Sequence, residues 1–341
     1  MTANSPIEIG GTTVKPGARV NVDLPVADLY TSTSLHMPVQ VICGRKAGPV
    51  LFVSAAIHGD ELNGVEIIRR LLNRKVLRSI RGTLLAVPIV NVHGFLNQSR
   101  YLPDRRDLNR SFPGSQKGSI AARLANLFIK QVVSKANYGI DLHTGAINRS
   151  NLPQIRANLD DPETLEIAQA FGVPVIINSD IRDGSLRACA YDRGMPVLIY
   201  EAGEALRFDE ISIRAGMRGI LNVMRQIGML PKLKNARQVM PVIARSTSWV
   251  RAPSSGIVTA RIRLGNSVQK DQSLASISTP LGDEEDHVIA PFDGIVIGQS
   301  KLPLAHEGDA LFHLGAFKSI PRVENLVENF AAEHEDDATP T

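Results

Sequence analysis

Two histidines and a glutamate stand where predicted strands end, a pattern typical of a metal site. His58 and Glu61 lie in the segment IHGDELNG, directly after the apolar run PVLFVSAAI. Because they are three positions apart, one turn can bring the imidazole and the carboxylate to a common point, and Gly59 and Gly64 would permit a tight strand-to-helix turn there. His143 ends another predicted strand in YGIDLHT. Such nitrogen and oxygen donors suit a zinc ion with an open coordination position.

Asp141 lies two positions before His143 and therefore on the same face of that strand. Its carboxylate can accept a hydrogen bond from a ligand imidazole and so orient the ring. Each signal has an ordinary alternative, since many helix starts carry H-x-x-E by chance and a strand-end histidine often bonds to the backbone. Two histidines and a glutamate at equivalent strand ends favour the metal interpretation.

Glu201 follows the apolar run PVLIY in the segment YEAG. An acidic side chain at the end of a buried strand is costly unless it is paired or functional. A carboxylate beside a metal-activated water can act as general base and then as acid to a leaving nitrogen. The alternative is a strand-end glutamate in a salt bridge.

Arginines are concentrated in the segment SRYLPDRRDLNRSFPG, residues 99–114. They could form a solvated loop. They could also form an anion clamp, because a guanidinium group pairs bidentately with a carboxylate.

The elements that must position these residues alternate between strands and helices. Residues 1–47 alternate apolar and polar positions between glycines and prolines, which predicts short leading strands. Continuous apolar runs then predict buried strands at 49–57, 83–90, 138–143, 173–178 and 196–203. Amphipathic patterns predict helices at 65–76, 119–133, 162–171 and 210–228. This alternation favours an α/β fold with a mostly parallel sheet, whose carboxyl edge would bind ligands.

The last third of the chain has a different character. A linker is predicted between 230 and 250, and short strands with turns follow it. RAPSSGIV (251–258) recurs as IAPFDGIV (289–296), and LGNSVQKDQSLASI has a shorter echo in EGDALFHL. Two copies of one β unit predict a small quasi-symmetric barrel. The acidic tail from about residue 320 is expected to be a short helix that frays into disorder.

Composition excludes several classes of protein. The 341 residues carry a formal charge of +4 without a long Lys/Arg run, which argues against a nucleic-acid partner. No apolar stretch approaches the roughly 20 residues that span a bilayer, and the first residues lack the apolar region of a secretory signal. Cys43 and Cys189 have no C-x-x-C spacing, which favours two reduced, partly buried thiols over a lone disulfide. We therefore expect a soluble, cytoplasmic protein with no membrane partner.

Taken together, the motifs H-G-D-E, D-L-N-R-x-F-P-G, D-L-H-T and E-x-G occur in this order over roughly residues 40–315. This pattern resembles the succinylglutamate desuccinylase/aspartoacylase family, zinc enzymes related to the metallocarboxypeptidases. The resemblance implies a three-layer, zinc-carboxypeptidase-like fold and one zinc ion per chain. It implies that the zinc ligands are His58, Glu61 and His143, and that Glu201 is the general acid/base.

The resemblance also implies roles for the arginines. Asn109 and Arg110 would hold the α-carboxylate of the substrate. Arg100 would polarise the scissile carbonyl and stabilise the oxyanion, with Arg105 as a competitor for that role. Arg187, in GSLRACAYDRG, is placed like the family arginine that reads an acidic substrate side chain. The implied reaction is hydrolysis of the amide bond of an N-acyl amino acid or a similar small carboxylate-bearing amide.

The C-terminal repeat resembles the hammerhead of biotinyl and lipoyl carrier domains. Those domains carry the cofactor on a lysine between the two halves, but no lysine occurs here between Lys270 and Lys301. We therefore expect a structural cap that shapes the cleft or an oligomer interface, whose histidines cap or pack: His287, His306 and His313. The expected organisation is leading strands at 1–47, a hydrolase domain at 48–232, the β module at 240–317 and a tail at 318–341.

Two rival functions stay open at this level. A metallocarboxypeptidase acting on short or acidic peptides would use the same Asn109 and Arg110 clamp on a peptide C-terminus. A catalytically inactive binding protein of the same fold would keep the architecture without turnover. The sequence leaves the oligomeric state and the identity of acyl group and amine open.

Overall fold

The protein is a mixed α/β structure, described here from a computed structural model that covers residues 2–179, 182–233, 240–244, 246–282 and 285–336. Its centre is a run of four parallel strands in the order β6 (Arg81–Val87), β5 (Lys46–Ala55), β7 (Tyr138–Gly145) and β10 (Val197–Glu204). These are the apolar runs that predicted buried strands. The expected parallel centre is confirmed.

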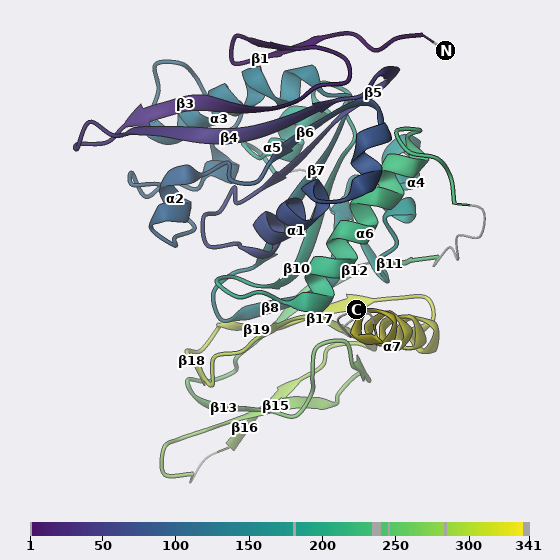
Figure 1. Ribbon diagram of the computed structural model, residues 1–341. Coiled ribbons are helices and arrows are strands. Elements are labelled where there is room, and N and C mark those ends of the chain that lie inside the picture. The colour runs from purple at the N-terminus through teal and green to yellow at the C-terminus, as the bar shows by residue number, and fades with distance from the viewer. Residues whose placement is uncertain (1, 180–181, 234–239, 245, 283–284, 337–341) are drawn as a thin grey trace.

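Antiparallel strands extend this centre on both sides into one mixed sheet of 13 strands. On one side β4 (Ser34–Cys43) pairs antiparallel with β6, and β3 (Arg19–Asp28) pairs with β4 to form a long hairpin (Figure 1). The expected short leading strands are seen only as β1 (Ile7–Ile9) and β2 (Thr12–Val14), a separate two-stranded sheet. The prediction of a mostly parallel sheet is therefore correct for the centre and wrong for the flanks.

On the other side lies β8 (Arg149–Ala157), a strand that the sequence patterns did not predict. It runs antiparallel to β10 and parallel to β9 (Val175–Asn178), which in turn pairs with β11 (Val242–Ala244). β8 also pairs antiparallel with a strand of the C-terminal region. It therefore joins the parallel centre to the last third of the chain.

Helices cover both faces of the sheet. α1 (Asn63–Leu72), α4 (Pro162–Phe171) and α6 (Glu210–Gln226) pack on one face, as Figure 1 shows, and α3 (Ile120–Gln131) and α5 (Leu186–Tyr191) pack on the other. Shorter helical segments are η1 (Lys75–Ser79), α2 (Val92–Leu96), η2 (Leu108–Arg110) and η3 (Val133–Lys135).

The long helices begin where the sequence offers side-chain caps. Ser119, Asp161 and Asp209 each accept a hydrogen bond from a backbone N–H in the first turn of α3, α4 and α6. Alternation along β7 then separates the two faces. Ile140 and Leu142 enter the core beneath α1 and α6, so Asp141 and His143 point to the opposite face.

The C-terminal β strands form two groups. β16 (Glu285–Ile289), β15 (Ser273–Ser278), β13 (Gly256–Ala260) and β18 (Leu304–Ala305) form a four-stranded sheet. β12 (Ser246–Arg251), β19 (Ala310–Ala316), β17 (Gly294–Ser300) and β14 (Ser267–Val268) belong to the large sheet, because β17 pairs with β8. The two groups enclose their own apolar core. We call these strands, residues 246–316, the C-terminal module.

The end of the chain is more ordered than expected. α7 (Ile320–Asp336) is a helix of 17 residues that packs on the module through Val323 and Val327, rather than a short fraying helix. The part of the predicted linker at 234–239, part of the turn between the repeat halves (283–284) and the tail end (337–341) lie outside the described residues.

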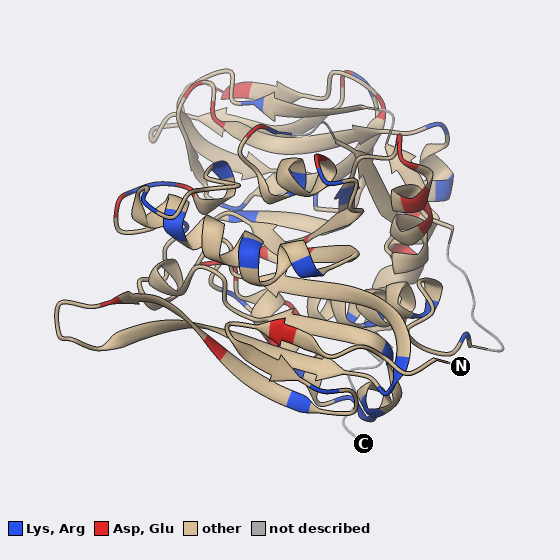
Figure 2. Ribbon diagram, turned by 90° about the horizontal axis from the view of Figure 1, so that it is seen from above, with Lys and Arg blue, Asp and Glu red and all other residues tan. Residues whose placement is uncertain are grey.

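Surface features agree with the composition. No helix in the described part of the chain combines the length and apolar character needed to cross a bilayer. Lys and Arg are interspersed with Asp and Glu over the elements seen in Figure 2. Cys43 and Cys189 are both free, as expected, and both are buried.

Candidate metal centre and active-site cleft

His58 and Glu61 lie in the turn between β5 and α1. The backbone N–H of Glu61 donates to the carbonyl of His58 at 3.2 Å, so a tight turn before the helix, rather than a helical turn, brings the two side chains together. Gly59 makes this turn possible by close approach. A Cβ atom there would lie 1.9 Å from the backbone carbon of Gly94, a separation that no side chain could occupy.

The carboxylate of Glu61 joins the two histidines. One oxygen lies 2.7 Å from Nδ1 of His58 and the other 2.8 Å from Nδ1 of His143. All three side chains are buried, and one ligand atom from each lies within 4.8 Å of the others. Burial alone would raise the pKa of Glu61, but the two imidazoles hold that pKa well below its usual range. The carboxylate is therefore ionised and ready to bind a cation.

The Nε2 atoms of both imidazoles contact carboxylates, on the side of each ring opposite to Nδ1. Nε2 of His143 lies 2.7 Å from Asp141, and Nε2 of His58 lies 3.2 Å from Asp107. Ser54 in turn donates to Asp141 at 2.8 Å. Carboxylates bonded to the outer nitrogen orient metal-binding histidines in this way. The two Nδ1 atoms and the Glu61 carboxylate therefore form a donor set that fits a divalent metal ion of the zinc type.

Electrostatics around the histidines follows from the same contacts. Burial alone would lower the pKa of His143, but the carboxylates of Asp141 and Glu61 raise it well above its ordinary value. The pKa of His58 is also raised, because Glu61 and Asp107 outweigh the effect of burial. The carboxylates thus favour protonated imidazoles in the free protein, and a metal ion that binds the ring nitrogens would displace those protons.

Glu201 lies next to this cluster on β10. In the parallel pairing of β10 with β7 it stands directly beside His143. Its carboxylate accepts a hydrogen bond from Nδ2 of Asn151 at 2.7 Å and lies 3.4 Å from Nε of Arg156. The salt-bridge alternative is therefore present in the structure, yet the carboxylate also lines the cleft described below.

Both partners of Glu201 come from β8, where a β-bulge puts them on the same face. Gln154 lies opposite Glu201, whereas Asn151 lies opposite Gly203, so one additional residue of β8 is accommodated between them. Without this register shift, Asn151 and Arg156 would point to opposite faces, because side chains alternate along a strand. Sequence reasoning missed both residues. Pro153, which is tolerated at bulges, was the available signal.

The arginine-rich segment forms a folded loop at the cleft. Nη2 of Arg100 donates to Asp107 at 2.9 Å, and its Nη1 lies 3.2 Å from Nδ1 of His58. Arg100 thus points at the place where the metal ligands converge, whereas Arg105 is exposed at a turn and does not line the cleft. Asp107, which was not singled out, fixes both Arg100 and His58.

Asn109 and Arg110 follow on η2. The side-chain oxygen of Asn109 accepts a hydrogen bond from the backbone N–H of Leu186 at 2.9 Å, which ties this loop to the start of α5. Nη1 of Arg110 donates to the carbonyl of Asn109 at 2.5 Å. Arg187, on α5, is buried and donates to Ser179 at 3.1 Å.

A cavity of about 420 Å³ brings these residues together. All eight side chains predicted to form the site line it: His58, Glu61, Arg100, Asn109, Arg110, His143, Arg187 and Glu201. It is also lined by residues that were not predicted, namely Arg149, Asn151, Arg156, Arg182 and Trp249. Six arginines therefore face two carboxylates within one cleft. Such an excess of positive charge favours an anionic ligand.

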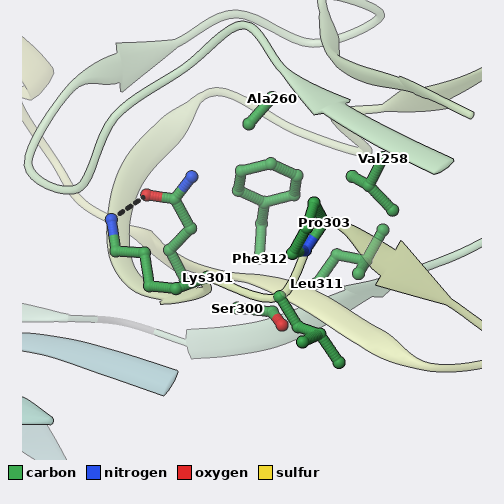
Figure 3. Close-up of a pocket in the computed structure, with 9 residues that line it drawn as sticks. Val258, Ala260, Ser300, Lys301, Pro303, Leu311 and Phe312 are labelled. Atoms are coloured by element: carbon green, nitrogen blue, oxygen red, sulfur yellow. Dashed lines mark hydrogen bonds between the residues drawn. The ribbon is translucent and has the colours of Figure 1, made fainter. Parts of the chain in front are cut away.

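A second, smaller cavity of about 140 Å³ lies inside the C-terminal module (Figure 3). Apolar side chains of β13 and β19 form much of its wall, and Lys301 donates a hydrogen bond to Gln299 at 2.9 Å. Unlike the large cleft, this cavity is not lined by histidines, carboxylates or arginines of the described part of the chain.

Fold and site together define a class of protein: a mixed α/β structure with a His–Glu–His metal cluster and a neighbouring carboxylate at the carboxyl edge of parallel strands. Residues 47–227, more than half of the chain, match the family described as Succinylglutamate desuccinylase/Aspartoacylase catalytic domain. The chain belongs to the succinylglutamate desuccinylase/aspartoacylase family.

Individual relatives agree with this assignment. The chain is 27% identical over 265 residues to N-alpha-acetyl-L-2,4-diaminobutyric acid deacetylase of Halomonas elongata, covering 74% of this chain and 78% of the relative. A succinylglutamate desuccinylase/aspartoacylase structure from Rhodobacter sphaeroides is 25% identical with a TM-score of 0.77, over 88% of this chain and 95% of the other.

The product-bound structure of the ectoine utilization protein EutE (DoeB) from Ruegeria pomeroyi is 24% identical with a TM-score of 0.78. The aligned regions cover 88% of this chain and 95% of the other. The relatives named for an activity are deacylases.

Proposed function

We propose that this protein is a zinc-dependent deacylase that hydrolyses the amide bond of an N-acyl amino acid or a similar small, carboxylate-bearing amide. One observation carries the proposal. The carboxylate of Glu201 stands beside His143 of the His–Glu–His cluster, inside a cleft rich in arginine. A metal-binding cluster, an adjacent carboxylate and anion-binding groups are the parts that amide hydrolysis of an anionic substrate requires.

Zinc is proposed because of the donor set. Two imidazole nitrogens and one carboxylate resemble the ligands of catalytic zinc sites, which keep a fourth position for water or substrate. When bound, zinc would act as a Lewis acid toward a carbonyl oxygen and would lower the pKa of water. His58, Glu61 and His143 would hold one ion per chain.

Glu201 would act as the general base and then as the general acid. As a base it would take the proton from the attacking water, and as an acid it would deliver that proton to the departing amine nitrogen. Asn151 and Arg156 hold its two oxygens on the cleft side of the sheet. This support fixes the direction from which the proton is exchanged.

The arginines would bind and polarise the substrate. Arg100 points at the converging metal ligands, so its guanidinium could stabilise the oxyanion that forms on the attacked carbonyl. Arg110 would pair with the α-carboxylate, together with Asn109. Arg187 is proposed to read an acidic side chain of the substrate.

A metallocarboxypeptidase acting on short or acidic peptides remains the alternative, since the same clamp would bind a peptide C-terminus. The cavity of about 420 Å³ suits a metabolite-sized ligand of either kind. The Halomonas relative is named for removing an acetyl group from an amino acid, which favours the deacylase.

The test is a parallel assay of N-acyl amino acids and of acidic di- and tripeptides with the zinc-loaded protein. We expect release of free acid and amine from the N-acyl amino acids. Release of C-terminal residues from peptides, with the N-acyl amino acids untouched, would replace the deacylase by the peptidase. Less than about half an equivalent of metal, with no activity after zinc is added, would favour an inactive binding protein.

Several further expectations belong to the same proposal. They are a cytoplasmic location, an architecture related to the zinc carboxypeptidases, and the division into leading strands (1–47), hydrolase domain (48–232), hammerhead-like β module (240–317) and tail (318–341). The module is proposed to be a structural cap that shapes the cleft or forms an interface between the copies of a homo-oligomer.

A further inference from the structure

The C-terminal module reaches the cleft through Trp249, which lines the cavity. Directly opposed residues run in a row across the sheet, from Trp249 on β12 through His313 on β19 and Gly298 on β17 to Asn151 on β8. Gly298 lets this row pack closely, because a Cβ atom there would lie only 3.0 Å from Oδ1 of Asn151 and 3.1 Å from Cβ of His313, and Cη2 of the indole lies 3.5 Å from the same point. The ring can therefore extend toward Asn151, which bonds to Glu201.

Arg149 is stacked on this indole. Its guanidinium carbon lies 4.4 Å from the ring centroid, and the ring of His313 stacks parallel to the indole at 4.6 Å. A cation held over an aromatic face is oriented before any ligand arrives. Burial, with a further contribution from Arg156 and Arg149, lowers the pKa of His313 to about 3. The histidine is thus neutral and adds no charge that would repel the guanidinium.

The guanidinium of Arg149 has not been neutralised by the protein itself. Arg100 is paired with Asp107, and Arg156 is paired with Glu201. Among the residues that the structure describes, no carboxylate forms an ion pair with Arg149, although Asp309 acts on it electrostatically. Its hydrogen bond goes to the backbone carbonyl of Ala310 at 3.4 Å. An arginine that lines a cleft, is already oriented and forms no ion pair with a carboxylate is suited to binding an anionic ligand.

We propose that Arg149, stacked on Trp249 of the C-terminal module, is a specificity-determining residue that pairs with an anionic group of the substrate other than the carboxylate proposed to bind Asn109 and Arg110. The inference rests on the proposed deacylase function. It makes the module part of the substrate site, since the indole that orients Arg149 comes from β12. A substrate that places an ammonium group there would be repelled.

Two isosteric substrate pairs test this. The first pair is an N-succinyl and an N-(4-methylpentanoyl) derivative of the same amino acid. The second pair is N-acetylaspartate and N-acetylleucine. In each pair a carboxylate is exchanged for an isopropyl group of similar shape, so steric differences are small. The first pair tests for an anion on the acyl side of the amide, and the second pair tests for an anion on the amine side.

We expect Arg149→Gln to lower kcat/KM for the anionic member of one pair by roughly ten- to a hundredfold, the value of a hydrogen bond to a charged group. The loss should appear mainly in KM, because the contact is made equally in ground and transition states. The apolar member should change less than about threefold. Arg149→Lys should keep part of the kcat/KM for the anionic substrate that Arg149→Gln loses. Trp249→Leu should weaken the preference for the anionic substrate, whereas Trp249→Phe should retain most of that preference.

Arg251 provides a matched control, because it is close enough to influence Arg149 but is exposed and does not line the cleft. Arg251→Gln removes the same charge from the same region and should leave the anion preference within about twofold of wild type, as expected for a screened surface charge. Equal losses in Arg149→Gln and Arg251→Gln would mean that general electrostatics, rather than direct pairing, sets the preference, and would overturn the proposal.

Calorimetric titration with succinate, 4-methylpentanoate, aspartate and leucine provides a readout that does not require turnover. Arg149-dependent binding of succinate or aspartate, in a protein that hydrolyses none of the amides, would uphold the anion site and remove the deacylase function. Hydrolysis with the same selectivity in wild type and Arg149→Gln, in both pairs, would remove the anion site and leave the deacylase intact.

Discussion

Replacing Glu201 by glutamine tests the proposed proton transfer while changing the structure very little. Glutamine has nearly the same shape, and its side-chain oxygen can still accept the hydrogen bond from Asn151 that Glu201 accepts at 2.7 Å. What it cannot do is take and release a proton. Since general acid–base catalysis contributes about 10²- to 10⁴-fold, we expect kcat to fall by at least about a hundredfold.

The structural cost of this substitution is small by comparison. Glutamine loses the contact of Glu201 with Arg156, where the two charged atoms are 3.4 Å apart and both side chains are about one-fifth exposed. Such a partly exposed pair contributes about 1 kcal/mol, which corresponds to a change in Tm of no more than about 3 °C in a chain of this size. The metal should be retained, because the side-chain partners of Glu201 are Asn151 and Arg156 rather than the metal-binding residues.

The assay therefore measures kcat, zinc content and Tm on the same preparation. Glu204→Gln is a matched control, since Glu204 lies on the same strand, pairs with Arg207 and does not line the cleft. It should keep turnover within about twofold, because its side chain lies outside the cleft and contacts none of the groups that are proposed to act on the substrate. If Glu201→Gln turned over within about tenfold of wild type, with zinc bound, Glu201 would not be the base.

Three other perturbations follow from the same contacts. Asp141→Asn should weaken zinc affinity roughly 10- to 100-fold by releasing the orientation of His143; a chelator competition showing unchanged affinity would contradict this. Gly59→Ala should destabilise by at least about 2 kcal/mol in urea denaturation, because its Cβ would overlap the backbone of Gly94; a change below about 0.5 kcal/mol would show that the turn can move. Glu66 is held by two arginines of α1, which lower its pKa from 4.5 to about 2. Glu66→Gln should therefore cost about 1 kcal/mol at neutral pH, a difference that shrinks as the pH falls from 4.5 toward 2, and a pH-independent difference would argue against the ion pairs.

The sequence was sufficient for the parts of the fold that depend on local pattern. Continuous apolar runs predicted β5, β6, β7 and β10, because a parallel strand covered on both faces must be apolar along its length. The segment Pro162–Phe171 was predicted with the bounds that α4 has, because an aspartate cap and a proline mark its first turn. Strand ends then located His58, His143 and Glu201.

Other features were not available from local pattern. β8 was missed, since the polar side chains of Arg149, Asn151 and Arg156 interrupt the apolar run that identifies a buried strand. Their common face depends on a bulge opposite β10, and a register shift between strands about 50 residues apart leaves little mark on the sequence. Strands were predicted within residues 1–47 and in the C-terminal region, but their antiparallel pairing with the central sheet was not, because pairing between distant strands is not contained in local pattern.

The sequence alone thus predicted the cluster of His58, Glu61 and His143, the neighbouring carboxylate and the family, because each rests on residue types at short spacing or at the ends of strongly patterned strands. The tertiary structure decided which arginines face the cleft and that Trp249 stands among them. Trp249 and Arg149 are 100 positions apart along the chain and meet only because β17 of the module pairs with β8. Pairing between distant strands is set by the packing of the whole molecule, and local spacing carries no record of it.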